Sequence, residues 1–148
     1  MAADGPRLGP SPLVVTAMDA RQQSLIQDTF HASGEGRLHF GEVIARLVEA
    51  GVESYAVDYR AARLTCYLPV GKALTLPQPP PAQAIATHFD AAAVRAAIAG
   101  AQRGEVMYPQ FKQLTQAAGC VGYIVWIGGR HVVYYGRHGD SHVERFPD

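Results

Sequence analysis

The C-terminal end of the chain carries the residues best suited to form a polar site. Between positions 137 and 145 every second residue has a side chain that can bind a metal or a proton: His138, Asp140, His142 and Glu144. In an extended strand these side chains project from one face at steps of about 6.6 Å. Imidazole and carboxylate groups bind zinc, manganese or iron, but neighbours on one strand reach one ion only if the strand bends near Gly139. The solvated face of a terminal strand explains the pattern more simply, so we predict no metal and no cofactor.

The tyrosines form a second candidate group, and two pairs of them recur at a spacing of 68 residues. The pairs are Tyr55 with Tyr123 and Tyr67 with Tyr135, and the group also includes Tyr108 and Tyr134. A buried tyrosine usually contributes packing and one hydrogen bond to a core. Alternatively, these rings line an aromatic cleft along a pseudo-symmetry axis, which would suit an apolar or planar ligand.

Three further residues near the C-terminus are candidate ligand contacts. His131 is expected opposite Trp126 across a β-hairpin, where its imidazole could titrate near neutral pH. Arg137, together with Arg130, could hold an anion. Each of these side chains could equally be a structural residue of the hairpin. The pattern is therefore compatible with ligand binding and with a purely structural role.

No catalytic signature accompanies these candidates. Glu53 and Asp58 lie five residues apart and therefore on opposite faces of a strand, which argues against a joint acid–base role. Cys66 and Cys120 lack the spacing of a metal or redox motif and are expected to be buried thiols. The chain contains no Walker loop and no GxGxxG, HExxH or GxSxG motif. The sequence therefore identifies no catalytic residue and leans away from an enzyme.

Composition and charge indicate a one-domain globular protein without a strong electric field. The chain has 148 residues, of which 48% are hydrophobic and 18% charged, and this length suffices for a substantial core. Its 13 basic residues balance its 13 acidic residues, so we predict neither nucleic-acid nor membrane binding. No apolar run approaches the roughly 20 residues of a membrane span, and no secretory signal is recognised. These features predict a cytoplasmic protein.

The second half of the chain echoes the first at an offset of 68 residues. Seven residues of 22–72 are identical to their counterparts in 90–140: Gly36/Gly104, Ala50/Ala118, Gly51/Gly119, Tyr55/Tyr123, Val57/Val125, Tyr67/Tyr135 and Gly71/Gly139. The matches fall after helices, in strands and at turns, where backbone geometry is decided. The spacing therefore predicts that one structural unit occurs twice, as pseudo-repeats 19–72 and 89–140.

Hydrophobic periodicity defines the elements of each unit. Helices are predicted at about 19–32, 39–50, 91–103 and from 109 to 118, and strands at 52–59, 63–70, 120–127 and 130–136. Gly128 and Gly129 predict a two-residue hairpin turn, because both can adopt positive φ. Each unit is thus a helix–helix–β-hairpin.

The two units are expected to form a single domain over residues 18–148. Joined, the hairpins give a four-stranded antiparallel sheet packed with helices, an α+β architecture. The proline-rich stretch 77–81 is predicted to be a stiff connector, since its prolines lack backbone donors. Residues 1–17 are predicted to be a disordered leader, and Met18 is an alternative translation start.

The residues of several stretches resemble an uncharacterised bacterial family labelled phage envelope protein-like. The resemblance covers about 20–147 and is carried by Ala50-Gly51-Val52-Glu53-Ser54-Tyr55, Val57-Asp58, Gln102, Gly104, Tyr108, Phe111, Ala118-Gly119-Cys120, Gly122-Tyr123 and Tyr135-Gly136-Arg137-His138-Gly139-Asp140 with Glu144, Phe146 and Pro147. It implies a domain of unknown function, with no catalytic residue to carry over. The label also implies an origin in prophage.

Three functions are compatible with these residues. We favour a small non-catalytic cytoplasmic module that binds a small molecule or a protein partner as a homodimer, since both faces of the C-terminal hairpin are largely apolar. The alternative is a small enzyme or metal-binding protein whose polar site lies between His138 and Glu144. A further alternative, suggested by the family label alone, is a prophage-derived structural protein.

Overall fold

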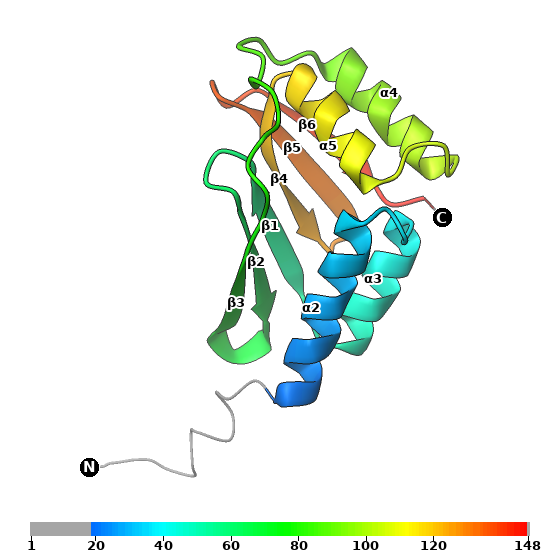
Figure 1. Ribbon diagram of the computed structural model, residues 1–148, viewed down its shortest axis with the longest axis vertical. Helices are drawn as coiled ribbons and strands as arrows, with labels where there is room; N and C mark the ends of the chain where they lie inside the picture. The colour runs from blue at the N-terminus through cyan, green and yellow to red at the C-terminus, as the bar shows by residue number, and fades with distance from the viewer. Residues whose placement is uncertain (1–18, 148) are drawn as a thin grey trace, which may run out of the picture.

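The structure, a computed structural model, describes residues 19–147 and consists of two layers. One layer is a six-stranded antiparallel sheet, and four α-helices cover one face of it (Figure 1). The predicted leader and the alternative start at Met18 lie outside the described residues. None of the described helices is long and apolar enough to cross a bilayer.

The helices form two pairs, one in each half of the chain. The first pair is α2 (Ala20–Gly34) with α3 (Phe40–Glu49), and the second is α4 (Ala91–Gln102) with α5 (Tyr108–Ala117). Asp19 and Asp90 begin α2 and α4 because their carboxylates accept hydrogen bonds from the backbone N–H groups of Gln22 and Ala93. The four predicted helices are therefore confirmed to within a few residues.

The sheet is larger than the sequence predicts. Its strands are β1 (Ser54–Asp58), β2 (Arg63–Leu68), β3 (Lys72–Pro77), β4 (Cys120–Trp126), β5 (His131–Gly136) and β6 (Ser141–Arg145). Their order across the sheet is β3-β2-β1-β4-β5-β6. The predicted four-stranded sheet is therefore wrong, because β3 pairs with β2 and β6 pairs with β5. Pro77 argues against a strand in the sequence because proline has no backbone N–H group. An edge strand tolerates this loss, since one of its sides has no neighbouring strand to bond.

Positions 68 residues apart hold matching places in the fold. Adding 68 to the bounds of α3 and of β2 gives the bounds of α5 and of β5. The backbone agrees as well, since φ is 84° at Gly51 and 86° at Gly119. The two halves meet at the centre of the sheet, where β1 pairs with β4. Duplication of an ancestral unit stays a prediction.

The C-terminal hairpin has the predicted register but a different turn. Trp126 pairs with His131, and Tyr123 pairs with Tyr134. The expected positive φ at both Gly128 and Gly129 is wrong: the left-handed residue is Arg130, with φ of 56°. The chain therefore reverses through the residue after the glycine pair.

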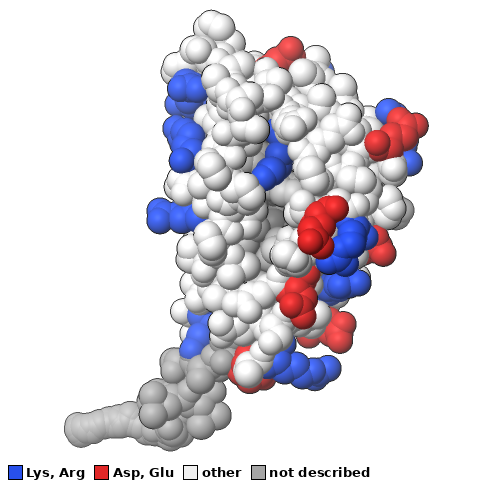
Figure 2. Space-filling model, in the orientation of Figure 1, with Lys and Arg blue, Asp and Glu red and all other residues white. Residues whose placement is uncertain are grey.

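The two faces of the sheet differ in what covers them. The face toward the helices is built from buried side chains such as Tyr55, Val57, Leu64, Tyr123 and Val132. The opposite face, which we call the open face, carries no helix in the described part of the chain (Figure 1). On the helix side, charges lie mostly along the margins, and the centre of the surface is largely uncharged (Figure 2).

Candidate functional site

A cavity of about 630 Å³ lies between the two helical pairs and the sheet. We call it the central cavity. Its wall includes residues of all four helices, of β1, β2, β4, β5 and β6, and of the loops that join α2 to α3 and α4 to α5. This volume is in the range of sites that bind small organic molecules.

Strand register arranges the side chains at the base of the central cavity in two rows. The first row runs across β1, β4, β5 and β6 as Tyr55, Val125, Val132 and Glu144. The second row runs beside it as Val57, Tyr123, Tyr134 and His142. Tyr55, Val132 and Glu144 of the first row line the cavity, and the small Val132 side chain leaves space beside the larger Glu144.

Aromatic rings surround this space. The Tyr123 ring packs against Tyr134, with ring centroids 5.4 Å apart, and edge-on against Tyr55 at 6.5 Å. Two phenylalanines extend the aromatic wall: Phe30 of α2 contacts Tyr55, and Phe111 of α5 contacts both Tyr123 and Tyr134. Five rings from the sheet and from two helices therefore enclose the base of the cavity.

The tyrosine hydroxyls divide into paired and unpaired groups. The Tyr123 hydroxyl donates to the Tyr108 hydroxyl at 3.0 Å. Tyr55 is 3% exposed and Tyr134 6% exposed, and within residues 19–147 neither hydroxyl has a hydrogen-bond partner. Unpaired buried hydroxyls are costly, so the cavity has two donors available to a ligand.

Burial controls the ionisation of these hydroxyls. Loss of hydration raises the pKa of Tyr55 and of Tyr123 well above the ordinary value, and the neighbouring tyrosines raise it further. Loss of hydration is also the largest cause that raises the pKa of Tyr134, and the nearby Cys120 and Glu144 groups raise this pKa further. All three side chains therefore remain neutral O–H donors at physiological pH.

A histidine and a carboxylate provide the polar part of the wall. His142 Nε2 lies 2.9 Å from Glu144 Oε1, and both side chains project from β6 toward the helix-covered face. Their side chains are 15% and 32% exposed, so the pair is partly shielded from water. Glu144 lines the central cavity beside Tyr134. This arrangement presents one carboxylate to a bound molecule.

The entrance is bordered by the two interhelical loops and the C-terminal tail. Phe40 of α3 contacts Phe146 of the tail, with ring centroids 5.5 Å apart. The Arg130 guanidinium lies over the Phe146 ring at 5.4 Å and donates to the Pro147 carbonyl at 3.2 Å. These contacts hold the tail against the first helical pair.

The structure separates the residues that the sequence grouped as candidate ligand contacts. Tyr55, Tyr123 and Glu144 line the central cavity, and His142 supports Glu144. Tyr67, Trp126, His131 and Tyr135 lie on the open face instead. Tyr67 and Trp126 border a shallow groove there.

Of the four polar residues predicted to alternate along one strand, only His142 and Glu144 lie on a strand, β6. Gly139, with φ of 87°, lies in a turn between β5 and β6, which leaves His138 and Asp140 exposed. Arg137 also lies there and donates to the Ile85 carbonyl at 3.0 Å. Among the described residues no group of three or more potential metal ligands comes together. The bend therefore disperses the four polar side chains.

The two cysteines are buried thiols, as predicted. Both are free, and burial raises the pKa of Cys66 to about 12 and that of Cys120 to about 11. Cys120 Sγ donates to the Gly122 carbonyl at 3.1 Å. Neither thiol has the low pKa of a reactive cysteine.

Several residues of the cavity carry no signal of their own in the sequence. Phe30, Phe40 and Phe146 look like ordinary apolar residues of two helices and a tail. Only the packing of both helical pairs on the sheet brings them together with Tyr134. The alternation of apolar residues in β5 was the one available sign, because it places Tyr134 on the same face as Val132.

The comparisons with known proteins place the chain in a family without assigning a function. The family model described as "Protein of unknown function (DUF1398)" matches residues 28–144. The chain belongs to the DUF1398 family. No curated protein matches it. In this DUF1398 member the match includes Tyr55, Tyr123, Tyr134 and Glu144, but the phage envelope label does not come with it.

Proposed function

We propose that this protein is a non-catalytic binding module that holds a small apolar or planar molecule in the central cavity. The observation that carries the proposal is a cavity of about 630 Å³ whose wall includes aromatic rings from the sheet and from three of the helices. Ligand sites of this kind are mostly apolar and contain a few fixed polar groups. Here Tyr55, Tyr134 and Glu144 supply those groups.

Two features make this cavity a better ligand site than the shallow groove on the open face. Its wall combines residues of the sheet with residues of all four helices, whereas the groove is lined by residues of the strands and their connections. Its hydroxyls at Tyr55 and Tyr134 are already removed from water, so a ligand acceptor would regain a lost hydrogen bond without further desolvation of the protein.

A cavity-filling variant tests the proposal directly. Ala101 lines the cavity, so Ala101→Leu is expected to weaken the binding of naphthalene, a planar apolar probe, at least about tenfold. Ala96→Leu adds the same side chain on an exposed position of the same helix and is the matched control. Binding would be measured by calorimetry and by the ligand-induced rise in Tm. Failure of naphthalene and of every other planar two-ring probe to bind the natural protein would contradict the proposal.

A second candidate function is acid–base catalysis in the same cavity. It is favoured by one observation, the Glu144–His142 pair beside the Tyr134 hydroxyl. A carboxylate and a phenol side by side can move a proton and stabilise the charge that develops. Exchange of ligand C–H for deuterium, lost in Glu144→Leu, would support catalysis. Unchanged ligand after long incubation would favour binding alone.

Assembly as a homodimer is also a proposal, and the open face is the surface that supports it. Tyr67 and Trp126 are 43% exposed and Val143 is 52% exposed. All three project from the face without helices. A second copy of the chain, applied face to face, would cover them. The cytoplasmic location stays a prediction, as does the absence of nucleic-acid and membrane partners.

A further inference from the structure

Tyr134, Glu144 and His142 form what we call the polar corner of the central cavity. Tyr134 pairs with His142 across β5 and β6, and Val132 pairs with Glu144. Tyr134 and Glu144 are therefore diagonal neighbours on one face of the sheet. Such positions lie about 7–8 Å apart at Cα, within reach of long side chains. Both line the cavity, so one ligand edge can contact both.

The polar corner presents a donor beside an acceptor. The Tyr134 hydroxyl is buried and has no hydrogen-bond partner within the described residues. The Glu144 carboxylate accepts hydrogen bonds only. His142 occupies its Oε1, and its Oε2 has no partner in the described part of the chain. The complementary ligand must therefore offer an acceptor for Tyr134 and a donor for Glu144, side by side.

Resting on the proposed small-molecule function, we infer that the ligand is a planar ring system with a ring N–H beside a ring carbonyl. Such a cyclic amide satisfies both groups at once: its carbonyl accepts from Tyr134, and its N–H donates to Glu144. Tyr123, Phe111 and Val132 line the same cavity, so the flat faces of the ligand would contact aromatic and aliphatic side chains.

Other charge classes fit the same corner less well. An anionic ligand would place its charge against the Glu144 carboxylate, away from bulk water. A cationic ligand would pair with Glu144 but leave the buried Tyr134 donor unpaired. A ligand with neither charge nor hydrogen-bonding group would leave both protein groups unpaired. A neutral cyclic amide leaves neither group unpaired.

A series of probes built on two fused six-membered rings separates these classes. Carbostyril has two fused rings with a ring N–H beside a ring carbonyl. N-methylcarbostyril lacks the donor, naphthalene lacks both groups, and naphthylmethylamine carries a cation. We expect carbostyril to bind the full chain about ten- to hundredfold more tightly than naphthalene, measured by calorimetry at neutral pH. N-methylcarbostyril should lose most of that gain.

Variants of the polar corner test whether it is the source of the higher affinity for carbostyril. Tyr134→Phe and Glu144→Leu should each weaken carbostyril at least about fivefold and leave naphthalene unchanged. Glu144→Gln keeps an acceptor and should lose less than Glu144→Leu. The control is Tyr59→Phe, because the Tyr59 hydroxyl bonds Thr115 and does not line the cavity. Thermal unfolding confirms that each variant is folded.

The outcomes distinguish this inference from the proposed function. If naphthalene and carbostyril bind with equal affinity, the cyclic-amide assignment is wrong and the proposed function stands. Tightest binding of naphthylmethylamine would also overturn it, in favour of a cationic ligand. If no probe binds, the proposed function itself fails. These comparisons use the natural protein alone, so they hold even if a variant does not fold.

Discussion

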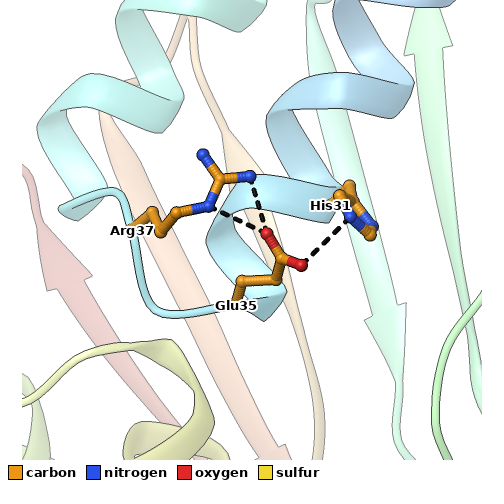
Figure 3. A network of polar contacts seen from close by, with 3 residues as sticks. All are labelled: His31, Glu35 and Arg37. Atoms are coloured by element: carbon orange, nitrogen blue, oxygen red, sulfur yellow. Dashed lines mark hydrogen bonds and ion pairs between the residues drawn. The ribbon is translucent and has the colours of Figure 1, made fainter.

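Glu35 and Arg103 lie 68 positions apart, and each forms an ion pair with the residue two positions further along. Glu35 Oε1 is 2.7 Å from an Arg37 nitrogen, and Arg103 contacts Glu105 at 3.0 Å. Figure 3 shows that Glu35 also contacts His31 of α2. The two interhelical loops therefore have the same type of ion pair with the charges exchanged. These loops also border the central cavity.

Removing Arg37 is expected to raise the pKa of Glu35. The hydrogen bond from Arg37 is the largest cause that lowers this pKa, and the charge of His31 adds to it. Arg37→Ala should therefore move the carboxyl pKa upward, toward the ordinary value for glutamate, as followed by NMR titration. Arg103→Ala is the matched control, since it breaks only the other pair, and should leave the Glu35 titration in place. Because the Glu35 side chain is solvent-exposed, the ion pair contributes little to stability, and Tm should change little in either variant.

Substitution of Gly51 and of Gly119 by alanine separates the cost of backbone strain from the cost of steric overlap. Gly51 and Gly119 both have φ near 85°, yet a Cβ on Gly119 would overlap the His88 carbonyl oxygen. A Cβ on Gly51 would meet only the amide of Gln22, at 3.3 Å. We expect Gly51→Ala to cost about 1 kcal/mol of unfolding free energy from its φ. Gly119→Ala should cost at least about 3 kcal/mol.

Urea unfolding of both variants measures the difference. Equal losses would show that the close approach of His88 to Gly119 does not limit the packing of the segment before α4 against the end of α5.

Local patterns predicted much of this fold because they act within a few residues. Asp19 and Asp90 mark helix starts, and Gly51 and Gly119 mark helix ends, by chemistry that needs no tertiary contact. The third strand of each half was not predictable in this way. Pro77 ends β3, and its role as an edge residue is defined only once β2 is in place.

The candidate site was predicted in part for the same reason. Tyr55 and Tyr123 were recognised because they occupy equivalent places in two similar halves. Tyr67 and Tyr135 share that spacing but lie on the open face, since each strand alternates its side chains between two faces. The polar corner depends on the pairing of β5 with β6, which the turn at Gly139 sets.

Homodimer formation through the open face is expected to depend on Trp126. Trp126→Glu places a charge on that face and should convert a dimer to a monomer in light scattering. Val48→Glu is the control, because Val48 is 56% exposed on α3, away from the open face. It should leave the oligomeric state unchanged. A natural protein that is monomeric at high concentration would contradict the dimer.

The buried tyrosines predict a steep loss of stability at alkaline pH. Burial raises the pKa of Tyr55, Tyr59 and Tyr123 well above the ordinary value, so these groups bind protons more tightly in the folded state. Above about pH 10 the unfolded chain loses these protons while the folded chain keeps them. The free energy of unfolding should therefore be constant up to that pH and fall beyond it.

The measurement is urea unfolding from pH 8 upward, with tyrosinate absorbance recorded on the same samples. Tyr59→Phe removes one of the titrating groups and should make the decline less steep, even though it also lowers stability at neutral pH by breaking the bond to Thr115. Loss of one titrating tyrosine changes the slope of the unfolding free energy against pH. Loss of the bond to Thr115 lowers the free energy already at neutral pH, so the two effects can be told apart. Tyrosinate that forms from Tyr55 and Tyr123 before the fold is lost would show that water already reaches the cavity.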